Sequence, residues 1–248
     1  MGLNSQLLTD NSALADWHYL PVFWTRWNVN HNYAKERLKE LESILKTGIL
    51  DPMKTFTVCQ YDDGPIVKIR GMRVFLASRK SNTGEDIPLL SSKHKLPIFS
   101  PRKEYLASFM GRLSTHPIRQ KMAEKLSGIN DIYINDGDIG SNKFVNTVLS
   151  SYIVLCPRGY GGSSFRFYET MQLGVVPMLI GNIDTRPFKK YINWDDCSIF
   201  VKNPSNIPKI LKKYSKEQLI MMGESAKSVW IENLSYLKWC KYVLEELQ

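Results

Sequence analysis

The residues with the clearest chemical potential lie between positions 155 and 182, which read LCPRGYGGSSFRFYETMQLGVVPMLIGN. This pattern predicts a strand, a glycine-rich loop, a helix and a second strand. Gly161 and the glycines beside it allow the backbone to approach a ligand closely, and Ser163 or Ser164 can cap the helix. Because a helix begins with free N–H groups and the positive end of its dipole, this segment predicts a binding site for an anion.

Two arginines and one acid flank the predicted helix start. The guanidinium groups of Arg158 and Arg166 suit phosphate oxygens, because they donate paired hydrogen bonds. Glu169 lies three residues after Arg166, on the same helical face. A carboxylate there can accept two hydrogen bonds from a ribose diol, so phosphate and ribose together indicate a nucleotide. The plainer interpretation, turn chemistry and an exposed Arg166–Glu169 pair, stays open.

Two known nucleotide-binding fingerprints are absent, which reduces the number of enzyme classes that fit the sequence. The sequence contains neither G-x-G-x-x-G, typical of dinucleotide enzymes, nor the phosphate loop G-x-x-x-x-G-K-[ST]. Their absence counts against an epimerase or another dinucleotide-dependent enzyme.

The elements that must position these residues alternate between short strands and helices, a pattern typical of α/β layers with parallel sheets. The ranges that predict strands are 18–25, 54–60, 72–77, 104–110, 131–135, 151–155 and 175–180. Those that predict helices are 33–46, 117–126, 142–150, 164–173, 207–213 and 216–248. An irregular stretch at 78–100 separates two α/β halves. Such folds bind ligands at the carboxyl ends of strands, in the crevice between the halves.

The composition fits a globular protein with a substantial core. The 248 residues are 43% hydrophobic and 23% charged, and the formal net charge is +9. A basic surface can serve nucleic acid, an anionic membrane or a phosphorylated small molecule, so charge alone selects none of these. The four cysteines lie far apart without a C-x-x-C pair, which predicts reduced thiols rather than a zinc site or disulfides. The sequence predicts no signal peptide and no membrane span.

Several motifs occur in an order that resembles the exostosin family, glycosyltransferase family 47. The main series comprises Pro157-Arg158-Gly159, Ser164, Arg166, Tyr168-Glu169, Gly174, Pro177, Pro187-Phe188 and Trp194. An upstream pair consists of Phe109-x-Gly111-Arg112 and Ile118-Arg119, and a weaker pair of Gln60-Tyr61-Asp62-Asp63-Gly64 and Asp86-Ile87-Pro88. The resemblance runs from about residue 21 to about residue 211 and is strongest over 105–194.

The resemblance implies a GT-B fold, an α/β architecture in which two Rossmann-like halves face a central cleft and a C-terminal helix packs back. Residues 1–100 would form the acceptor-side domain, and residues 101–248 the domain that binds a nucleotide-sugar, with a UDP-sugar favoured. The family inverts the anomeric carbon, usually without a metal, so no cofactor is expected. The implied donor contacts are Arg158 and Arg166 on the diphosphate, Gly161, Ser163 and Ser164 in support, Glu169 on the ribose, and Arg112 near the phosphates.

An inverting transfer needs a general base that takes the proton of the acceptor hydroxyl. Asp62 and Asp63 are the candidates, because they follow the predicted strand at 54–60 on the acceptor side. Asp-Asp-Gly is equally a good turn sequence, so a purely structural role stays open. Four histidines are alternative bases, although surface or structural roles are commoner for each of them: His18, His31, His94 and His116.

Animal exostosins carry a membrane anchor and luminal disulfides, and this sequence shows neither. That departure favours a bacterial or viral enzyme in the cytoplasm, or in the host cytoplasm if viral. We expect a glycan or glycolipid acceptor, no nucleic-acid partner, and at most peripheral membrane contact. Two rival interpretations stay open: a catalytically inactive nucleotide- or sugar-binding protein, and a basic nucleic-acid-binding module, for which the sequence holds no recognisable motif.

Overall fold

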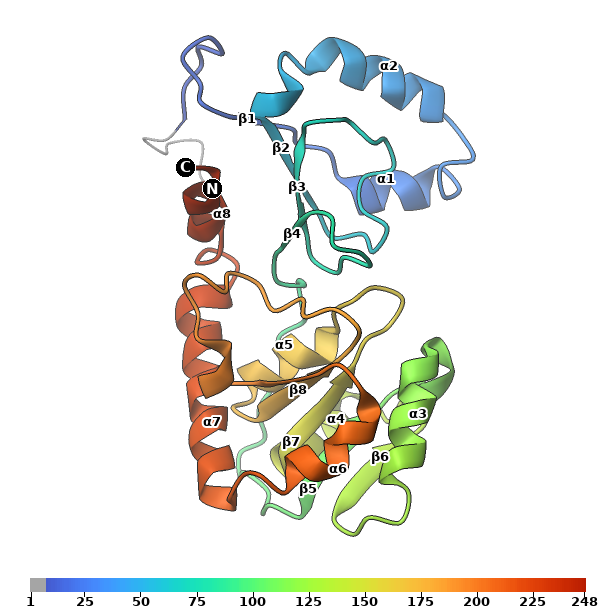
Figure 1. Cartoon of the computed structure of the whole chain (residues 1–248), viewed down its shortest axis with the longest axis vertical. Helices are drawn as coiled ribbons and strands as arrows, with labels where there is room; N and C mark the ends of the chain where they lie inside the picture. The colour runs from blue at the N-terminus through green and yellow to red at the C-terminus, as the bar shows by residue number, and fades with distance from the viewer. Residues whose placement is uncertain (1–7) are drawn as a thin grey trace.

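A computed structural model describes residues 8–248 and contains two parallel β-sheets, one above the other in Figure 1. The first sheet has the order β1-β2-β3-β4 and comprises β1 (His18–Tyr19), β2 (Thr55–Cys59), β3 (Arg73–Leu76) and β4 (Glu85–Asp86). The second has the order β6-β5-β7-β8-β9 and comprises β5 (Tyr105–Met110), β6 (Ile132–Asn135), β7 (Ser151–Pro157), β8 (Val176–Ile180) and β9 (Ile199–Val201). Every strand pair is parallel, which confirms the expected α/β class.

The strand order creates a topological switch point in the second sheet. β5 pairs with β6 on one side and with β7 on the other. The connections that leave β5 and β7 therefore diverge at the carboxyl edge of the sheet and leave a crevice, where open α/β sheets bind their ligands.

Helices cover both sheets. The first half contains α1 (Trp24–Asn30) and α2 (Leu38–Gly48), and the second contains α3 (Pro117–Leu126), α4 (Ser141–Leu149), α5 (Phe165–Gln172), α6 (Ile207–Leu211) and α7 (Lys216–Val229). After α7 the chain returns toward the first half and ends in α8 (Cys240–Leu247) (Figure 1). Short 3-10 segments lie at Pro52–Lys54, Leu113–Thr115, Trp194–Asp196 and Pro204–Asn206, and a π-helical segment at Trp230–Leu234.

The helix expected at 33–46 begins later than the hydrophobic spacing indicated. α2 starts only at Leu38, because the preceding backbone enters the left-handed region. The φ angles of Tyr33 and Arg37 are both +55°, which no right-handed helix accommodates.

Two other expected elements are shorter than predicted. The segment 18–25 pairs as a strand over two residues only and turns into α1 at Trp24. The helix expected over 216–248 is broken, because α7 continues only as a π-helical turn to Leu234, and the extended backbone of Ser235 ends it before α8 begins at Cys240. The short edge strands β4 and β9 were not predicted.

The second sheet is covered on both faces, which explains the continuous apolar character of its central strands. One hydrophobic cluster joins α3 and α6 to one face, with Met122, Leu126, Ile207 and Leu211 as members. Another joins α4 and α5 to the opposite face, with Val145, Phe167, Tyr168 and Met171 as members. Along β7, Ile153 and Leu155 belong to the first cluster and Val154 to the second, as the alternation of a strand requires.

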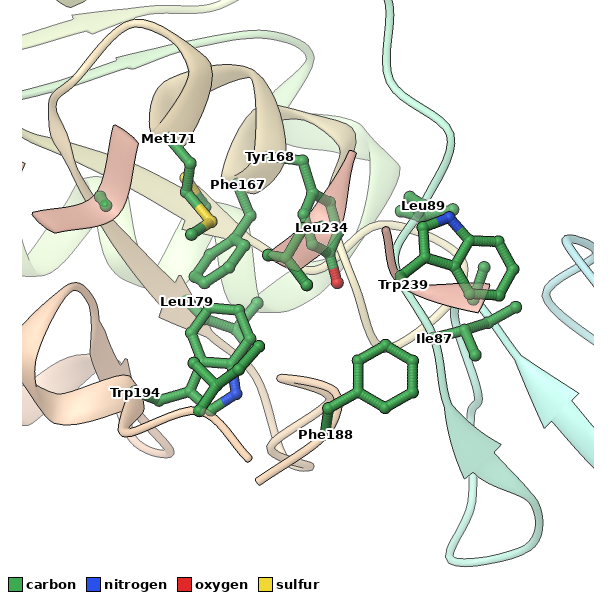
Figure 2. Close-up of a cluster of buried hydrophobic side chains, with 14 of the residues drawn as sticks. Ile87, Leu89, Phe167, Tyr168, Met171, Leu179, Phe188, Trp194, Leu234 and Trp239 are labelled. Atoms are coloured by element: carbon green, nitrogen blue, oxygen red, sulfur yellow. The ribbon is translucent and has the colours of Figure 1, made fainter. Parts of the chain in front are cut away.

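The second of these clusters continues into the first half of the chain. Figure 2 shows Ile87 and Leu89, from the segment after β4, near Phe188 and Trp239 of the second half. This cluster therefore spans both sheets, whereas α1 and α2 pack on the first sheet through a separate cluster that includes Trp24, Leu41 and Leu45.

The last helix packs back onto the first sheet, as the fold prediction required. The indole Nε1 of Trp17 donates to the carbonyl oxygen of Leu247 at 2.7 Å, and Nη1 of Arg73 donates to that of Glu246 at 2.6 Å. Among the helices within residues 8–248, none is both long enough and apolar enough to cross a membrane.

Candidate active site

Two adjoining cavities lie at the carboxyl edge of the second sheet, beside its switch point. The first has a volume of about 280 Å³ and receives side chains from both halves, including Asp62 and Ser78 from the first half. The second has a volume of about 390 Å³ and lies between the loops that follow β5 and β6. Arg166 and Glu169 line both cavities, so the two adjoin at α5.

Arg166 lies where the two cavities meet, over the end of β5. Its guanidinium carbon is 4.8 Å from the ring centroid of Phe109. Any side chain at Gly111 would collide with Nη2 of Arg166, and the φ angle of +143° at this position also favours glycine. The Nε atom of Arg166 is buried and has no hydrogen-bond partner among residues 8–248. Burial lowers the pKa of Arg166, because it removes water from the charged guanidinium, and an anionic ligand would supply the partner that Nε lacks.

The start of α5 presents further donors to the first cavity. Ser164 is the N-cap residue, with φ −145° and ψ 131°, and its hydroxyl makes no capping hydrogen bond. Ser163 and Ser164 are both buried, at 4% and 7% exposure, and both line the cavity. The first N–H groups of a helix have no partner within the helix, so hydroxyl and N–H donors converge here.

Glu169 faces His94, which comes from the connection between the two sheets. Nε2 of His94 lies 3.2 Å from Oε1 of Glu169, although the two are not aligned as a hydrogen bond. The His94 ring packs against Phe144 of α4, with centroids 5.3 Å apart. Both residues of the pair line the second cavity, and Arg112 lines it from the loop after β5.

The structure separates the two candidate bases. Asp62 lines the first cavity, whereas the exposed carboxylate of Asp63 forms an ion pair with Lys80 at 2.5 Å. Burial raises the pKa of Asp62, against the opposing effects of a hydrogen bond from Ser78 and of nearby cations. Of the two, Asp62 alone is placed to act on a ligand in the cavity.

Residues 76–214, more than half of the chain, match the family model described as the exostosin GT47 domain. The chain belongs to the exostosin family. Over 83 residues it is 35% identical to an exostosin-1 homologue of Caenorhabditis elegans, covering 33% of this chain and 22% of that protein. Over 138 residues it is 25% identical to a probable glucuronoxylan glucuronosyltransferase of Arabidopsis thaliana, covering 50% and 29%.

The chain thus spans less than a third of the length of these relatives.

Among solved structures, TarM is similar with a TM-score of 0.46 at 10% identity, covering 83% of this chain and 57% of TarM. The resemblance to exostosins that the motifs indicated is confirmed. Their family is one of glycosyltransferases, and the two sheets, shared cleft and returning helix of this member have the GT-B arrangement.

Arg158 lies outside both cavities, although the sequence placed it on the diphosphate. Its Nε donates to the carbonyl oxygen of Gly161 at 3.1 Å, its Nη2 to that of Tyr160 at 3.2 Å, and its Nη1 to the side-chain oxygen of Asn182. Each of the three guanidinium nitrogens thus donates one hydrogen bond within the protein. The position of Arg158 therefore supports a role in holding the glycine-rich loop.

The glycines of this exostosin-family loop allow the two halves to touch. A side chain at Gly161 would collide with Asp62 and Ser78, and one at Gly162 with the carbonyl oxygen of Arg79. The N–H of Ser163 donates to Oγ of Ser78 at 3.2 Å. The sequence predicted that these glycines admit a ligand, and Gly161 does line the first cavity, while the first half of the chain also packs against both glycines.

Arg119 is a cavity residue to which sequence reasoning gave no role. It lies on α3, is 8% exposed and lines the first cavity. Its guanidinium donates to the carbonyl oxygens of Arg112, Pro157 and Arg158, and burial lowers its pKa to about 10. The motif Ile118-Arg119 signalled the position, but the contacts join segments that only the fold brings together.

Among the described residues, His94 is the histidine that lines a cavity, whereas His18, His31 and His116 line neither of the two. Nδ1 of His116 accepts from the N–H of Ile118 at 3.2 Å and caps α3. In residues 8–248 no three side chains of His, Cys, Asp or Glu lie close enough to hold a metal ion together. Metal independence stays a prediction.

Proposed function

We propose that this chain is an inverting glycosyltransferase that moves a sugar from a nucleoside diphosphate donor, with a UDP-sugar favoured, to a hydroxyl of a glycan or glycolipid. One observation carries the proposal. The buried guanidinium of Arg166, with its unpartnered Nε, meets the start of α5 in a cavity that Asp62 enters from the other half of the chain. This places a cationic anion-binding site opposite a carboxylate.

The donor occupies both cavities in this proposal. Its diphosphate lies at the start of α5, where Arg166 and the hydroxyls of Ser163 and Ser164 bind it. Glu169 accepts hydrogen bonds from the ribose, and the second cavity, near Arg112, takes the nucleoside. Membership of the exostosin family supports a nucleotide-sugar as the ligand.

The acceptor enters the first cavity beside Asp62. Two exposed aromatic side chains, Tyr160 at 73% and Phe165 at 56%, form part of the cavity lining and offer ring faces to the apolar face of a sugar. The other lining groups are mainly polar, which suits the hydroxyls of a glycan.

The transfer follows from this placement. Asp62 takes the proton of the acceptor hydroxyl, and the oxygen of that hydroxyl forms the new bond to the anomeric carbon. The bond between that carbon and the diphosphate oxygen breaks on the opposite side, which inverts the configuration, and the nucleoside diphosphate leaves with the electron pair. Arg166 and the N–H groups of α5 stabilise the charge that develops there, so we expect transfer to continue in the presence of a chelator.

A thermal-shift screen with UDP, GDP and their sugars tests the donor site. Saturation at 100 times the dissociation constant stabilises a protein by about 2.7 kcal/mol, so one nucleotide class should raise the Tm selectively. Arg166→Ala removes charge-assisted hydrogen bonds that contribute about 1.5–3 kcal/mol each, and should weaken binding at least about tenfold. Glu169→Ala should likewise abolish most of the shift.

Arg26→Ala and Glu224→Ala, on exposed residues outside the cavities, serve as matched controls and should bind as the parent chain does. If Arg166→Ala and Glu169→Ala fold and still bind nucleotide normally, the proposed site is wrong. Nucleotide binding without transfer or donor hydrolysis would instead indicate a binding protein. An NMR assignment of the anomeric configuration of the product tests inversion.

A further inference from the structure

The connection between the two sheets is unusual in charge. Residues 87–103 contain no Asp or Glu, although acidic residues stand at both borders, Asp86 and Glu104. The stretch contains no helix or strand. It includes the sequence KHKLPIFSPRK, in which cations surround an apolar run.

Both ends of this connection are fixed to the second half. Nε2 of Gln172 donates to Oγ of Ser91 at 2.8 Å at one end, and Nζ of Lys103 donates to the carbonyl oxygen of Ser151 at 2.6 Å at the other. Between these anchors, His94 reaches the second cavity. The residues after His94 are therefore held at a defined place on the surface.

The middle of the connection exposes large apolar side chains. Leu96 is 53% exposed, Ile98 93% and Phe99 86%, and we call these three residues the apolar tip. Pro97, within the tip, and Pro101, just after it, restrict the backbone of this segment. Isolated exposed apolar residues are ordinary, but a contiguous group held outward on an anchored loop indicates a surface that meets another apolar phase.

Three cations surround the apolar tip. Lys93, Lys95 and Arg102 are all exposed, and none of them forms an ion pair with any residue in the described range 8–248. Their charges are thus available to a partner. Apolar side chains flanked by free cations are complementary to a lipid surface that carries negative headgroups.

We propose that residues 93–102 dock this protein onto an anionic lipid surface. The apolar tip enters the boundary between headgroups and acyl chains, and the three cations meet the lipid phosphates. A second copy of the chain fits less well, because a symmetric contact would bring six cations together. The inference stands on these observations and not on the proposed transfer, although docking would hold the second cavity, through His94, near the lipid.

Vesicle co-sedimentation of the full chain tests the proposal. We expect binding to vesicles of equal parts phosphatidylglycerol and phosphatidylcholine, weak binding to pure phosphatidylcholine, and release by salt. The double variant Ile98→Ser/Phe99→Ser should weaken binding at least about tenfold, because two apolar side chains lose their burial. The triple variant Lys93→Gln/Lys95→Gln/Arg102→Gln should weaken it by about fivefold for each cation removed.

Control variants distinguish binding through this site from nonspecific binding through other exposed cations or apolar side chains. Leu237→Ser removes an apolar side chain that is 85% exposed elsewhere, and Lys39→Gln/Lys212→Gln/Lys213→Gln removes the same charge from other exposed positions. Both should bind vesicles as the parent chain does, and thermal unfolding should show that every variant is folded.

The proposal is overturned if the chain binds neither kind of vesicle, if it binds both equally, or if the two loop variants bind anionic vesicles unchanged. Light scattering provides the last arm. A dimer that becomes a monomer in Ile98→Ser/Phe99→Ser would assign the apolar tip to self-association and would also overturn the proposal.

Discussion

At the scale of single residues, neighbours in the sequence take different roles. Asp62 and Asp63 were equivalent candidates, yet the first lines a cavity and the second faces solvent with Lys80. Arg158 and Arg166 were both expected on a phosphate, yet the guanidinium of Arg158 donates to its own loop and to Asn182 after β8. The types of residue were predictable from the motif, but the direction of each side chain depends on contacts that only the folded chain brings together.

Asp62→Asn should separate catalysis from stability. Loss of the base should lower kcat by about 10²–10⁴-fold while nucleotide binding is retained. Because burial raises the pKa of Asp62, the folded chain carries a penalty whenever this carboxylate is ionised. The variant should therefore have a slightly higher Tm than the parent at neutral pH, and the difference should vanish as pH falls through the pKa of Asp62.

Steady-state kinetics and melting curves across a pH series measure both effects. The acid limb of kcat/KM in the parent should lie above the usual range for aspartate, because the base must be ionised to act. Asp63→Asn is the control and should keep both the rate and the Tm. A parent-like rate in Asp62→Asn would assign the base to another group.

At the scale of elements, helices that begin at a residue typical of a helix start were predictable from the sequence. Short strands that form only by pairing with a neighbour were not. The range 117–126 was predicted and is the range of α3, because Pro117 marks its first turn. α5 and β8 were found to within one residue. The edge strand β4 was missed, because its two residues have no apolar alternation and pair only through the neighbouring β3.

The loop between β7 and α5 is the element that carries the site, and Gly162→Ala tests how it is held. A side chain there would collide with the carbonyl oxygen of Arg79, so the two halves must separate locally. We expect a loss of unfolding free energy of about 1–3 kcal/mol, together with a lower kcat, since Asp62 loses its alignment with α5. Gly48→Ala, with nothing within 4 Å of the added carbon, should change stability by less than about 1 kcal/mol. Equal effects in the two variants would show that the contact between the halves is loose.

At the scale of the whole molecule, the sequence indicated two α/β halves, and the boundary near residue 100 stays a prediction. What the sequence could not indicate is that the hydrophobic core runs through both halves. Ile87 and Leu89 are ordinary apolar residues within an irregular stretch, and only the fold places them against Phe188 and Trp239. Pairing over such distances along the chain leaves no periodic pattern in the sequence.

Tyr242 of α8 tests whether the halves behave as one unit. It is 5% exposed, and its ring lies 5.0 Å from that of Phe188 and 4.9 Å from that of Tyr191, centroid to centroid. Tyr242→Ala should cost about 3–5 kcal/mol, which corresponds to a fall in Tm on the order of 10 °C. Because one hydrophobic cluster joins the two halves, calorimetry of Tyr242→Ala should show a single transition at a lower Tm. The control Tyr236→Ala, at a residue 48% exposed, should leave the Tm unchanged. If Tyr242→Ala splits the melting curve and only one of two transitions moves, the halves unfold independently, and the cleft between them is then free to open without disrupting either sheet.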